Sequence, residues 1–361
     1  MATTSYGVNH PLAVKLWAKK LFHEALKETS FAQFLGEGSD SLIQKRTELS
    51  KSAGDQITIG LRMQLSGQGI AGDSTLEGNE EALTTYNDAM TINQLRHAVR
   101  SAGKMSEQRV TFDVRNEAKM GLVDWWKDRL DTAFFNQLAG YTGQADTRYT
   151  GNQAALAPTS ARLLVASTAA TKPAAETSLS ETTTMYLRLA DIDRAVATAK
   201  TASPVIRPLK IGGKEMYACF LHPYQVYQLR ADASTTGNWF DLQRQGLSGP
   251  KWADNPIFTG ALGIYNQTIL YESTRVPNTV TADATQADQT VFRRAIFCGA
   301  QAGAIAFGQD GKETEATWVE EKFDYGNQLG VSGGMIFGLK KMVFNSQDFS
   351  TITISSYAPT P

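Results

Sequence analysis

The sequence has little of what most metal and redox sites require. It contains only two cysteines and four histidines in 361 residues and has neither a C-x-x-C nor an H-E-x-x-H motif, so a zinc site has almost nothing to build on. Cys219 and Cys298 each lie in an apolar stretch, which predicts reduced core residues. A disulfide between them would require their strands to be neighbours. We therefore predict no metal and no cofactor.

Long apolar runs and an excess of one charge sign are also absent. No stretch of about 18 apolar residues occurs, and the first residues do not have the pattern of a secretion signal, so no membrane partner is expected. Lys and Arg number 35 against 36 for Asp and Glu, a formal net charge of −1. Phosphate backbones are therefore not the expected main source of affinity. With 42% hydrophobic residues, the chain is expected to fold around one large core or two medium ones.

One glycine-rich motif invites an enzymatic interpretation. Residues 67–72, GQGIAG, have the G-x-G-x-x-G spacing of loops that hold dinucleotide phosphates. That role needs a helix opening at the last glycine, whereas residues 73–81 carry four carboxylates and a further glycine. An oxidoreductase using Gly67, Gly69 and Gly72 is thus the weakest alternative, and the motif is predicted to be a flexible loop tip.

The stretches on either side of this tip predict a hairpin. Residues 56–65 and 83–92 are both strand-like, and they are separated by an unusually long end. Between Gly60 and Met90, five carboxylates accompany Arg62 alone, a local net charge near −4. Because like charges on adjacent strands repel, we expect the tip to face positive residues of another subunit.

Helical periodicity predicts a long helix and an amphipathic N-terminal arm. Apolar residues follow helical spacing over residues 111–138, and Gly140 is placed to end the run. About 28 residues would make a helix of roughly 42 Å. The adjacent Trp125 and Trp126 point about 100° apart. Either both belong to a broad core face, which is the preferred interpretation, or one enters the core while the other reaches a second surface. Residues 11–35 have apolar residues on one face.

The rest of the chain predicts surface loop, then mixed α and β structure. Residues 143–184 are rich in Ala, Thr and Ser without a sustained period and are interpreted as loop or insertion. Helices are expected at 187–201 and 223–231, with Asp191 and Asp193 as charges that complement a helix N-terminus. Residues 330–334 match G-x-S-x-G, but a strand-like stretch follows them, so a glycine-rich bend between strands is expected instead of a nucleophile. No catalytic residue is predicted.

Several long stretches, in this order, resemble one protein family. They are LWAKKLFHEALKETSFAQFLG, GDQITIGLRMQLSGQGIAGDSTLEGNEEALT, INQLRHAVRSAGKMSEQR, WWKDRLDTAFFNQLAG, FLHPYQVYQLR, NPIFTGALGIYN and EKFDYGNQLGVSGGMIFGLKKMVFN. They resemble the major capsid proteins of N4-like tailed bacteriophages across nearly the whole chain.

The resemblance implies an α+β Hong Kong 97-type capsid fold. The implied parts are an N-terminal arm (residues 1–50), an extended loop (51–103), a peripheral domain (104–184 and 311–361) with a spine helix at about 111–139, and an axial domain (185–310). Covalent locking of shells of this fold uses a lysine on the extended loop, and no lysine lies between Lys51 and Lys104.

The same resemblance implies a function without catalysis. The chain is expected to assemble with copies of itself, as hexamers and pentamers, into the icosahedral shell around the double-stranded DNA genome of a tailed phage. Implied partners are a separate scaffolding protein, a portal, a decoration protein where one is used, and packaged DNA bound without sequence specificity. Assembly in the bacterial host cytoplasm and a final place in the virion capsid follow. The alternative on the same fold is the shell of an encapsulin-like bacterial compartment.

Nine residues are candidate inter-subunit contacts. They come from the arm, the hairpin and the long helix: Trp17, Phe22, Arg62, Asp73, Glu77, Glu80, Glu81, Trp125 and Trp126.

Overall fold

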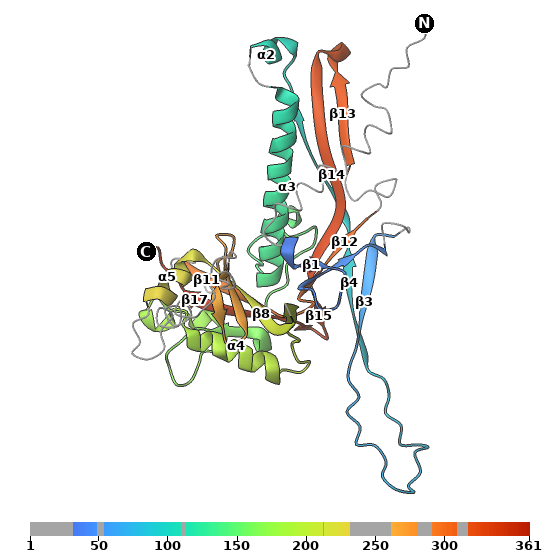
Figure 1. Cartoon of the computed structure of the whole chain (residues 1–361), viewed down its shortest axis with the longest axis vertical. Coiled ribbons are helices and arrows are strands. Elements are labelled where there is room, and N and C mark those ends of the chain that lie inside the picture. The colour runs from blue at the N-terminus through green and yellow to red at the C-terminus, as the bar shows by residue number, and fades with distance from the viewer. Residues whose placement is uncertain are drawn as a thin grey trace.

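The computed structural model describes residues 32–48, 54–109, 113–211, 213–231, 261–279, 291–308 and 317–361. These residues form a six-stranded sheet, a seven-stranded sheet, two two-stranded ladders and four α-helices (Figure 1). The α-helices are α2 (Lys104–Gln108), α3 (Val114–Ala139), α4 (Leu189–Thr201) and α5 (Pro223–Ala231). Short 3-10 helices are η1 (Ala32–Phe34), η3 (Thr147–Tyr149), η4 (Ser160–Arg162), η5 (Glu176–Ser178), η6 (Thr183–Met185) and η10 (Asp324–Gly326).

The six-stranded sheet is organised around one long strand. Its members are β1 (Leu35–Gly36), β2 (Ile43–Arg46), β5 (Asn93–Arg100), β12 (Gly303–Phe307), β13 (Thr317–Phe323) and β14 (Gln328–Lys341). Strand β14 pairs antiparallel with β5, β12 and β13, while β2 pairs parallel with β12 and β1. In Figure 1 the β13–β14 hairpin stands beside the upright helix α3.

Helix α3 has the expected length and ends for identifiable reasons. Its N-cap Asp113 accepts a hydrogen bond from the Arg115 backbone N–H at 3.0 Å. Gly140 follows the last turn with φ 62°, a left-handed conformation that glycine adopts without strain. The 26 residues span about 39 Å at 1.5 Å per residue. The helix thus begins a few residues later than the predicted start and ends where expected.

The seven-stranded sheet has helices on one face and the end of α3 on the other. Its strands are β6 (Leu163–Val165), β7 (Leu209–Ile211), β8 (Lys214–Leu221), β9 (Ala261–Tyr265), β10 (Thr268–Glu272), β11 (Phe292–Cys298) and β17 (Thr351–Tyr357). On one face Tyr217, Cys219 and Leu221 pack into a core with α4 and α5. On the other, Ala218 and Phe220 join the core around α3. This alternation is the period of two expected of a strand buried on both faces.

Phe220 joins the two halves of the molecule. Its ring contacts those of Phe134 and Phe135 on α3 edge-on, each at a centroid distance of 5.6 Å. Phe34 approaches the same ring at 5.3 Å. Such edge-to-face pairs add to the stabilisation from burial of apolar area. The large core is therefore continuous from the six-stranded sheet to the seven-stranded one.

A buried ion pair also fixes the C-terminal end of α3. Arg294 on β11 donates through Nε to Glu176 Oε1 at 2.7 Å and through Nη1 to the Gly140 carbonyl at 2.8 Å. The side chains of Arg294 and Glu176 are only 3% and 8% exposed. Ser355 on β17 donates its hydroxyl to the same carboxylate. Three distant segments thus meet at the end of the helix.

The glycine-rich residues 330–334 lie inside β14, so the expected bend between strands was wrong. Paired strands on both edges hold this stretch extended. The glycines leave room for what crosses them. A Cβ on Gly330 would lie 2.7 Å from the Phe323 ring, one on Gly334 would lie 2.9 Å from Arg96 Cγ, and one on Gly338 would lie 2.2 Å from the Thr91 carbonyl oxygen.

Residues 143–184 are tied into the core more closely than a surface loop. Val165, Glu176 and Leu179 are buried, and β6 pairs parallel with β17. Arg162 is completely buried and donates to the carbonyls of Asp348 and Pro204. The Ala, Thr and Ser composition gave no period because the segment packs through isolated residues instead of one continuous face.

Sheet membership differs from the grouping expected from the resemblance. The C-terminal strand β17 and strand β6 were expected in the peripheral domain, yet both belong to the seven-stranded sheet. Strands β5 and β12, expected in the extended loop and axial domain, belong to the six-stranded sheet. The reason is that β14 and β17 pair with strands that are far away in the sequence.

The two cysteines lie on neighbouring strands and remain free. Cys219 is paired in register with Phe297, the residue before Cys298. Successive residues of a strand point to opposite faces, and the two thiols accordingly belong to different cores. Both are completely buried, and burial raises the pKa of the Cys219 thiol to about 12. Neighbouring strands alone therefore do not permit a disulfide.

Candidate inter-subunit surfaces

The most prominent candidate surface is the hairpin of β3 (Gln56–Arg62) and β4 (Thr85–Thr91). Its base is anchored by Met90, which is fully buried and packs in one cluster with Ala304, Ala306, Met342 and Phe344. Ile57 and Ile59 pack against the same cluster. Beyond Met63 every residue from 64 to 85 is exposed. Figure 1 shows the hairpin extending well past both sheets, away from the β13–β14 tip.

The exposed part of the hairpin is held in shape by its own carboxylates. Glu81 accepts hydrogen bonds from the backbone N–H groups of Ser66 at 2.8 Å and Gly67 at 2.6 Å. These two backbone donors lower the pKa of Glu81 below its ordinary value. Glu80 accepts from the Gly78 N–H at 2.8 Å. The two adjacent glutamates therefore have a role within the loop.

The G-x-G-x-x-G residues are arranged as turns instead of a phosphate cradle. Gly69 and Gly72 have φ of 70° and 67°, and no helix begins after Gly72. A dinucleotide loop places its anion at a helix N-terminus. The dinucleotide-binding alternative is therefore wrong for this loop, as the acidic residues after it indicated.

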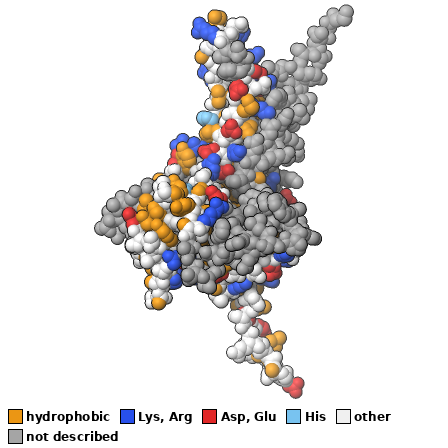
Figure 2. Space-filling view, turned by 60° about the vertical axis from the view of Figure 1, so that its left-hand side comes forward, with side chains coloured by type: hydrophobic (Ala, Val, Ile, Leu, Met, Phe, Trp, Pro, Cys, Tyr) orange, Lys and Arg blue, Asp and Glu red, His pale blue; other side chains and the backbone are white. Residues whose placement is uncertain are grey.

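The charges expected at the tip divide into two groups. Asp73 and Glu77 are exposed and form no hydrogen bond or ion pair with the described part of the chain. Arg62 is also exposed, at the end of β3. Asp88, which was counted with the tip, instead pairs with Lys340, and these side chains are only 10% and 14% exposed. Figure 2 shows acidic and hydrophobic side chains together at the far end of the hairpin.

Four large apolar side chains accompany these charges. Leu65, Leu76 and Leu83 are 58%, 61% and 57% exposed, and Ile70 is 39% exposed. Single exposed apolar residues are ordinary, but four on one projecting loop have no core of their own to cover them. The tip therefore combines apolar area with free negative charge.

Both tryptophans of the pair on α3 pack against this chain's own large core, as expected of a broad core face. Trp126 is 4% exposed and approaches Phe337 at 6.1 Å between ring centroids. Trp125 is half-buried and stacks on His97 of β5 at 4.5 Å. Trp126 is therefore a core residue that a neighbouring subunit cannot contact. Its prediction as an inter-subunit contact was wrong. Trp17 and Phe22 lie outside the described residues.

Asp191 is the titratable group of α4 with the clearest perturbation. The Arg188 backbone N–H donates to Asp191 Oδ2 at 3.2 Å, which confirms a capping role. Burial raises the pKa of Asp191 to about 6. Asp193 instead accepts hydrogen bonds from the Tyr265 hydroxyl at 2.7 Å and Asn266 Nδ2 at 2.8 Å.

In the described ranges, no three His, Cys, Asp or Glu side chains are arranged to hold a metal ion. No helix within those ranges is long and apolar enough to cross a membrane. The features that stand out are an anchored projecting hairpin, a long helix and two sheets sharing a core.

Similarity to known proteins accounts for this combination. A family described as "Phage capsid protein" matches residues 4–360. The chain belongs to this phage capsid protein family. It is 30% identical over 367 residues to the major capsid protein of Pseudomonas phage KPP25, covering 94% of this chain and 93% of that protein. The family is one of structural shell proteins and not of enzymes.

Solved capsids show the same fold. The capsid protein of Ralstonia phage GP4 is 32% identical, with a TM-score of 0.76 and coverage of 100% of this chain and 99% of that one. That of cyanophage Pam1 is 22% identical, with a TM-score of 0.74 and coverage of 93% and 94%. The phage capsid protein described here accordingly has the expected Hong Kong 97-type fold and is a major capsid protein of a tailed phage. These matches favour the phage shell over the bacterial compartment.

Proposed function

We propose that this capsid protein assembles as hexamers and pentamers around the double-stranded DNA of an N4-like phage. The proposal includes assembly in the host cytoplasm with a separate scaffolding protein, a portal and, where one is used, a decoration protein. DNA is enclosed without sequence recognition, in keeping with the formal net charge of −1. The observation that carries self-assembly is the anchored hairpin, whose residues 64–85 are all exposed.

The proposed division of labour follows sheet membership. The peripheral part comprises α3 and the six-stranded sheet, and the axial part comprises the seven-stranded sheet with α4 and α5. The arm is proposed to be shorter than residues 1–50, because Phe34, Leu42 and Ile43 are buried in this chain's own core. Truncation up to Gly36 would therefore damage the fold as well as any contact.

The hairpin tip is proposed to bind a neighbouring subunit through its apolar side chains and its free carboxylates. Reversal at Glu80 and Glu81 would be a poor test, because both carboxylates bond to the loop's own backbone. Asp73 and Glu77 lack such bonds. Variation at these two positions changes the charge that a neighbour meets and leaves those backbone bonds intact.

The test uses two double variants and the wild-type protein. One variant reverses both charges (Asp73→Lys and Glu77→Lys), and the other neutralises them (Asp73→Asn and Glu77→Gln). We expect slower shell formation by light scattering, with charge reversal more severe than neutralisation. Rising salt should reduce the difference in assembly rate between the variants, because the electrostatic screening length shortens to about 10 Å at 0.1 M. Negative-stain microscopy checks that the product is closed particles. Equal assembly rates for all three proteins at low salt would refute the electrostatic part. Wild-type protein that forms no closed shell, even when it is produced together with its scaffolding protein, would refute the proposed assembly.

A further inference from the structure

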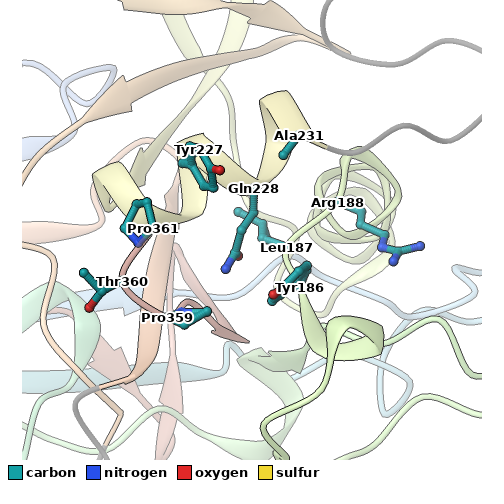
Figure 3. A pocket seen from close by; sticks show the side chains of 9 residues that line it. All are labelled: Tyr186, Leu187, Arg188, Tyr227, Gln228, Ala231, Pro359, Thr360 and Pro361. Carbon is teal, nitrogen blue, oxygen red and sulfur yellow. The ribbon is translucent and has the colours of Figure 1, made fainter.

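A pocket of about 340 Å³ lies next to α5 and is lined by that helix, by the residues before α4 and by the end of the chain (Figure 3). Gln228 is part of its lining, but the amide nitrogen and oxygen of Gln228 have almost no solvent-accessible area. A ligand in the pocket cannot reach these two atoms, so the buried amide does not identify a binding site. The base of the β3–β4 hairpin has contacts with a clearer consequence.

Strand β4 leads from the hairpin directly into the six-stranded sheet. A single residue, Ile92, separates β4 from β5. On one side of it, Gln153 Nε2 donates to the Thr91 carbonyl at 2.8 Å. On the other side, Asn152 Nδ2 donates to the Asn93 carbonyl at 3.2 Å. Because the backbone is held on both sides, Ile92 is the point about which the hairpin turns relative to the sheet.

Asp88 connects the hairpin to two other strands. Its Oδ1 accepts a hydrogen bond from Lys340 Nζ on β14, and its Oδ2 accepts one from the Val343 backbone N–H of β15 (Val343–Phe344) at 3.0 Å. Lys340 Nζ also donates to the Ala89 carbonyl at 2.8 Å. The side chains of Asp88 and Lys340 are only 10% and 14% exposed, so salt screens this pair less than a surface pair. Together these contacts form the Asp88 tie.

The tie provides a direction that the apolar cluster around Met90 does not. Burial of Met90 together with Phe344 favours contact between the hairpin and the rest of the subunit, but the hydrophobic effect is non-directional. Hydrogen bonds weaken steeply away from their preferred distance and angle. The two oxygens of one carboxylate bond to donors on two different strands, so they fix the direction in which β4 leaves the sheet.

A small movement at the tie becomes a larger one at the exposed end of the hairpin. Strands rise about 3.3 Å per residue, so Asp88 lies about 13 Å from Ile92 along β4. Gly78, near the end of the hairpin, is more than three times as far from Ile92 along the chain. The backbone bonds to Glu81 brace this outer part. For a rigid arm, a shift of about 1 Å at Asp88 therefore moves the end by about 3 Å.

We propose that the Asp88 tie positions the hairpin and thereby sets the diameter of the shell. This inference rests on the proposed shell function, in which the hairpin of one copy meets a neighbouring copy. Contacts between copies close into a shell only if the angle between successive copies is correct. The tie acts inside one subunit, so Asp88 and Lys340 are positioning residues.

Two substitutions break the tie in different ways, and a third preserves it. Lys340→Met keeps most of the side-chain volume but removes the ammonium group. Asp88→Asn has one acceptor oxygen where aspartate has two, so it cannot serve both donors in the same geometry. Lys340→Arg keeps a cation that can donate to Asp88 and is the expected rescue. Lys322→Met, at an exposed position of β13 in the same sheet, is the matched control.

Distances within the unassembled subunit test whether the tie positions the hairpin. Spin labels are attached at Ser74→Cys on the exposed loop and at Ala197→Cys on an exposed position of α4. The two natural cysteines are buried and do not interfere. Dipolar spectroscopy should give one narrow distance for the unsubstituted subunit, the control and Lys340→Arg. In Lys340→Met and Asp88→Asn this distance should shift or broaden by about 3 Å for each 1 Å of movement at Asp88.

Two results of this measurement would overturn the proposal. One is the same distance distribution in the tie variants as in the control. The other is loss of folding in both tie variants, checked by circular dichroism, because the tie would then stabilise the whole subunit instead of positioning the hairpin.

Particle diameters test whether this position matters for the shell. Each variant is produced in the same way as the wild type, and its particles are measured by negative-stain microscopy. We expect one diameter for the wild type and Lys340→Arg, and a wider range of diameters or open shells for Lys340→Met and Asp88→Asn. Shells of wild-type diameter from subunits whose hairpin has moved would overturn the proposal and leave the proposed function standing. Wild-type protein that forms no shell would instead count against the proposed function, while the label distances would still decide whether the tie positions the hairpin.

Discussion

Removing Arg294 should destabilise the subunit far more than removing any exposed charge. Replacement by Met preserves much of the side-chain volume but leaves Glu176 buried, with Ser355 as its remaining side-chain partner. The Gly140 carbonyl at the end of α3 also loses its donor. Both changes occur where the ion-paired side chains are less than a tenth exposed.

The magnitude follows from the burial. Breaking a buried pair by removing one partner costs about 3–5 kcal/mol, mainly because an uncompensated charge stays in the interior. Glu176→Leu should cost less, since Arg294 keeps the carbonyls of Ala139 and Gly140 as acceptors. With both residues apolar, no buried charge remains, and the loss should fall to about 1–2 kcal/mol for the unpaired carbonyl group.

Urea unfolding of unassembled subunits, fitted as a double-mutant cycle, measures these differences. Arg148→Met is the matched control, because its partner Asp146 and its own side chain lie at the surface, where Arg148 is 69% exposed; no measurable change is expected there. A double variant as unstable as Arg294→Met, or a single variant no worse than the control, would show that the buried pair does not determine the stability of this junction.

Three further outcomes are expected. Asp191 has a folded-state pKa of about 6 against an ordinary value of 3.8, so its contribution to the free energy of unfolding is full below pH 4 and is lost as the pH rises through 6. Asp191→Asn should therefore reduce the difference in the free energy of unfolding between pH 4 and pH 7 by about 2–3 kcal/mol, measured by unfolding at both pH values. Gly338→Ala should cost about 1–3 kcal/mol because its Cβ would meet the Thr91 carbonyl oxygen, whereas Gly60→Ala, which meets nothing within 4 Å, should be tolerated; equal unfolding midpoints would refute the steric argument. Mature particles should yield single chains in hot detergent, since no lysine lies between Lys51 and Lys104, and a covalent ladder on a reducing gel would contradict this.

Local patterns predicted the elements that carry their own signals. Helix α3 has an N-cap aspartate, helical spacing and a terminal glycine, so its end could be located from the sequence. Strands β3 and β4 flank a glycine-rich tip and were likewise expected. Strand β5 was not expected in the six-stranded sheet, because only Leu95 of its eight residues is buried and no alternation marks it. Its partner β14 begins more than 200 residues later.

The same limit applies to the candidate contacts. The acidic character of the tip was visible in the sequence, but the pairing of Asp88 with Lys340 depends on residues 252 positions apart. The internal role of Glu81 depends on which backbone N–H groups the folded loop presents. The unpartnered amide of Gln228 gave no sequence signal, since a glutamine on a helix is ordinary until its surroundings are known.

The late position of β14 and β17 in the chain has a consequence for synthesis on the ribosome. The six-stranded sheet has no central strand until residues 328–341 are made, and the seven-stranded sheet lacks the strand joining β6 to β11 until residues 351–357 follow. Neither core can therefore close while the nascent chain is short, although the projecting hairpin is translated early. Contacts between residues so far apart are also slow to form. Subunits released before these strands are made would have a hairpin without a complete core behind it, so unfinished chains would be poorly suited to enter a shell.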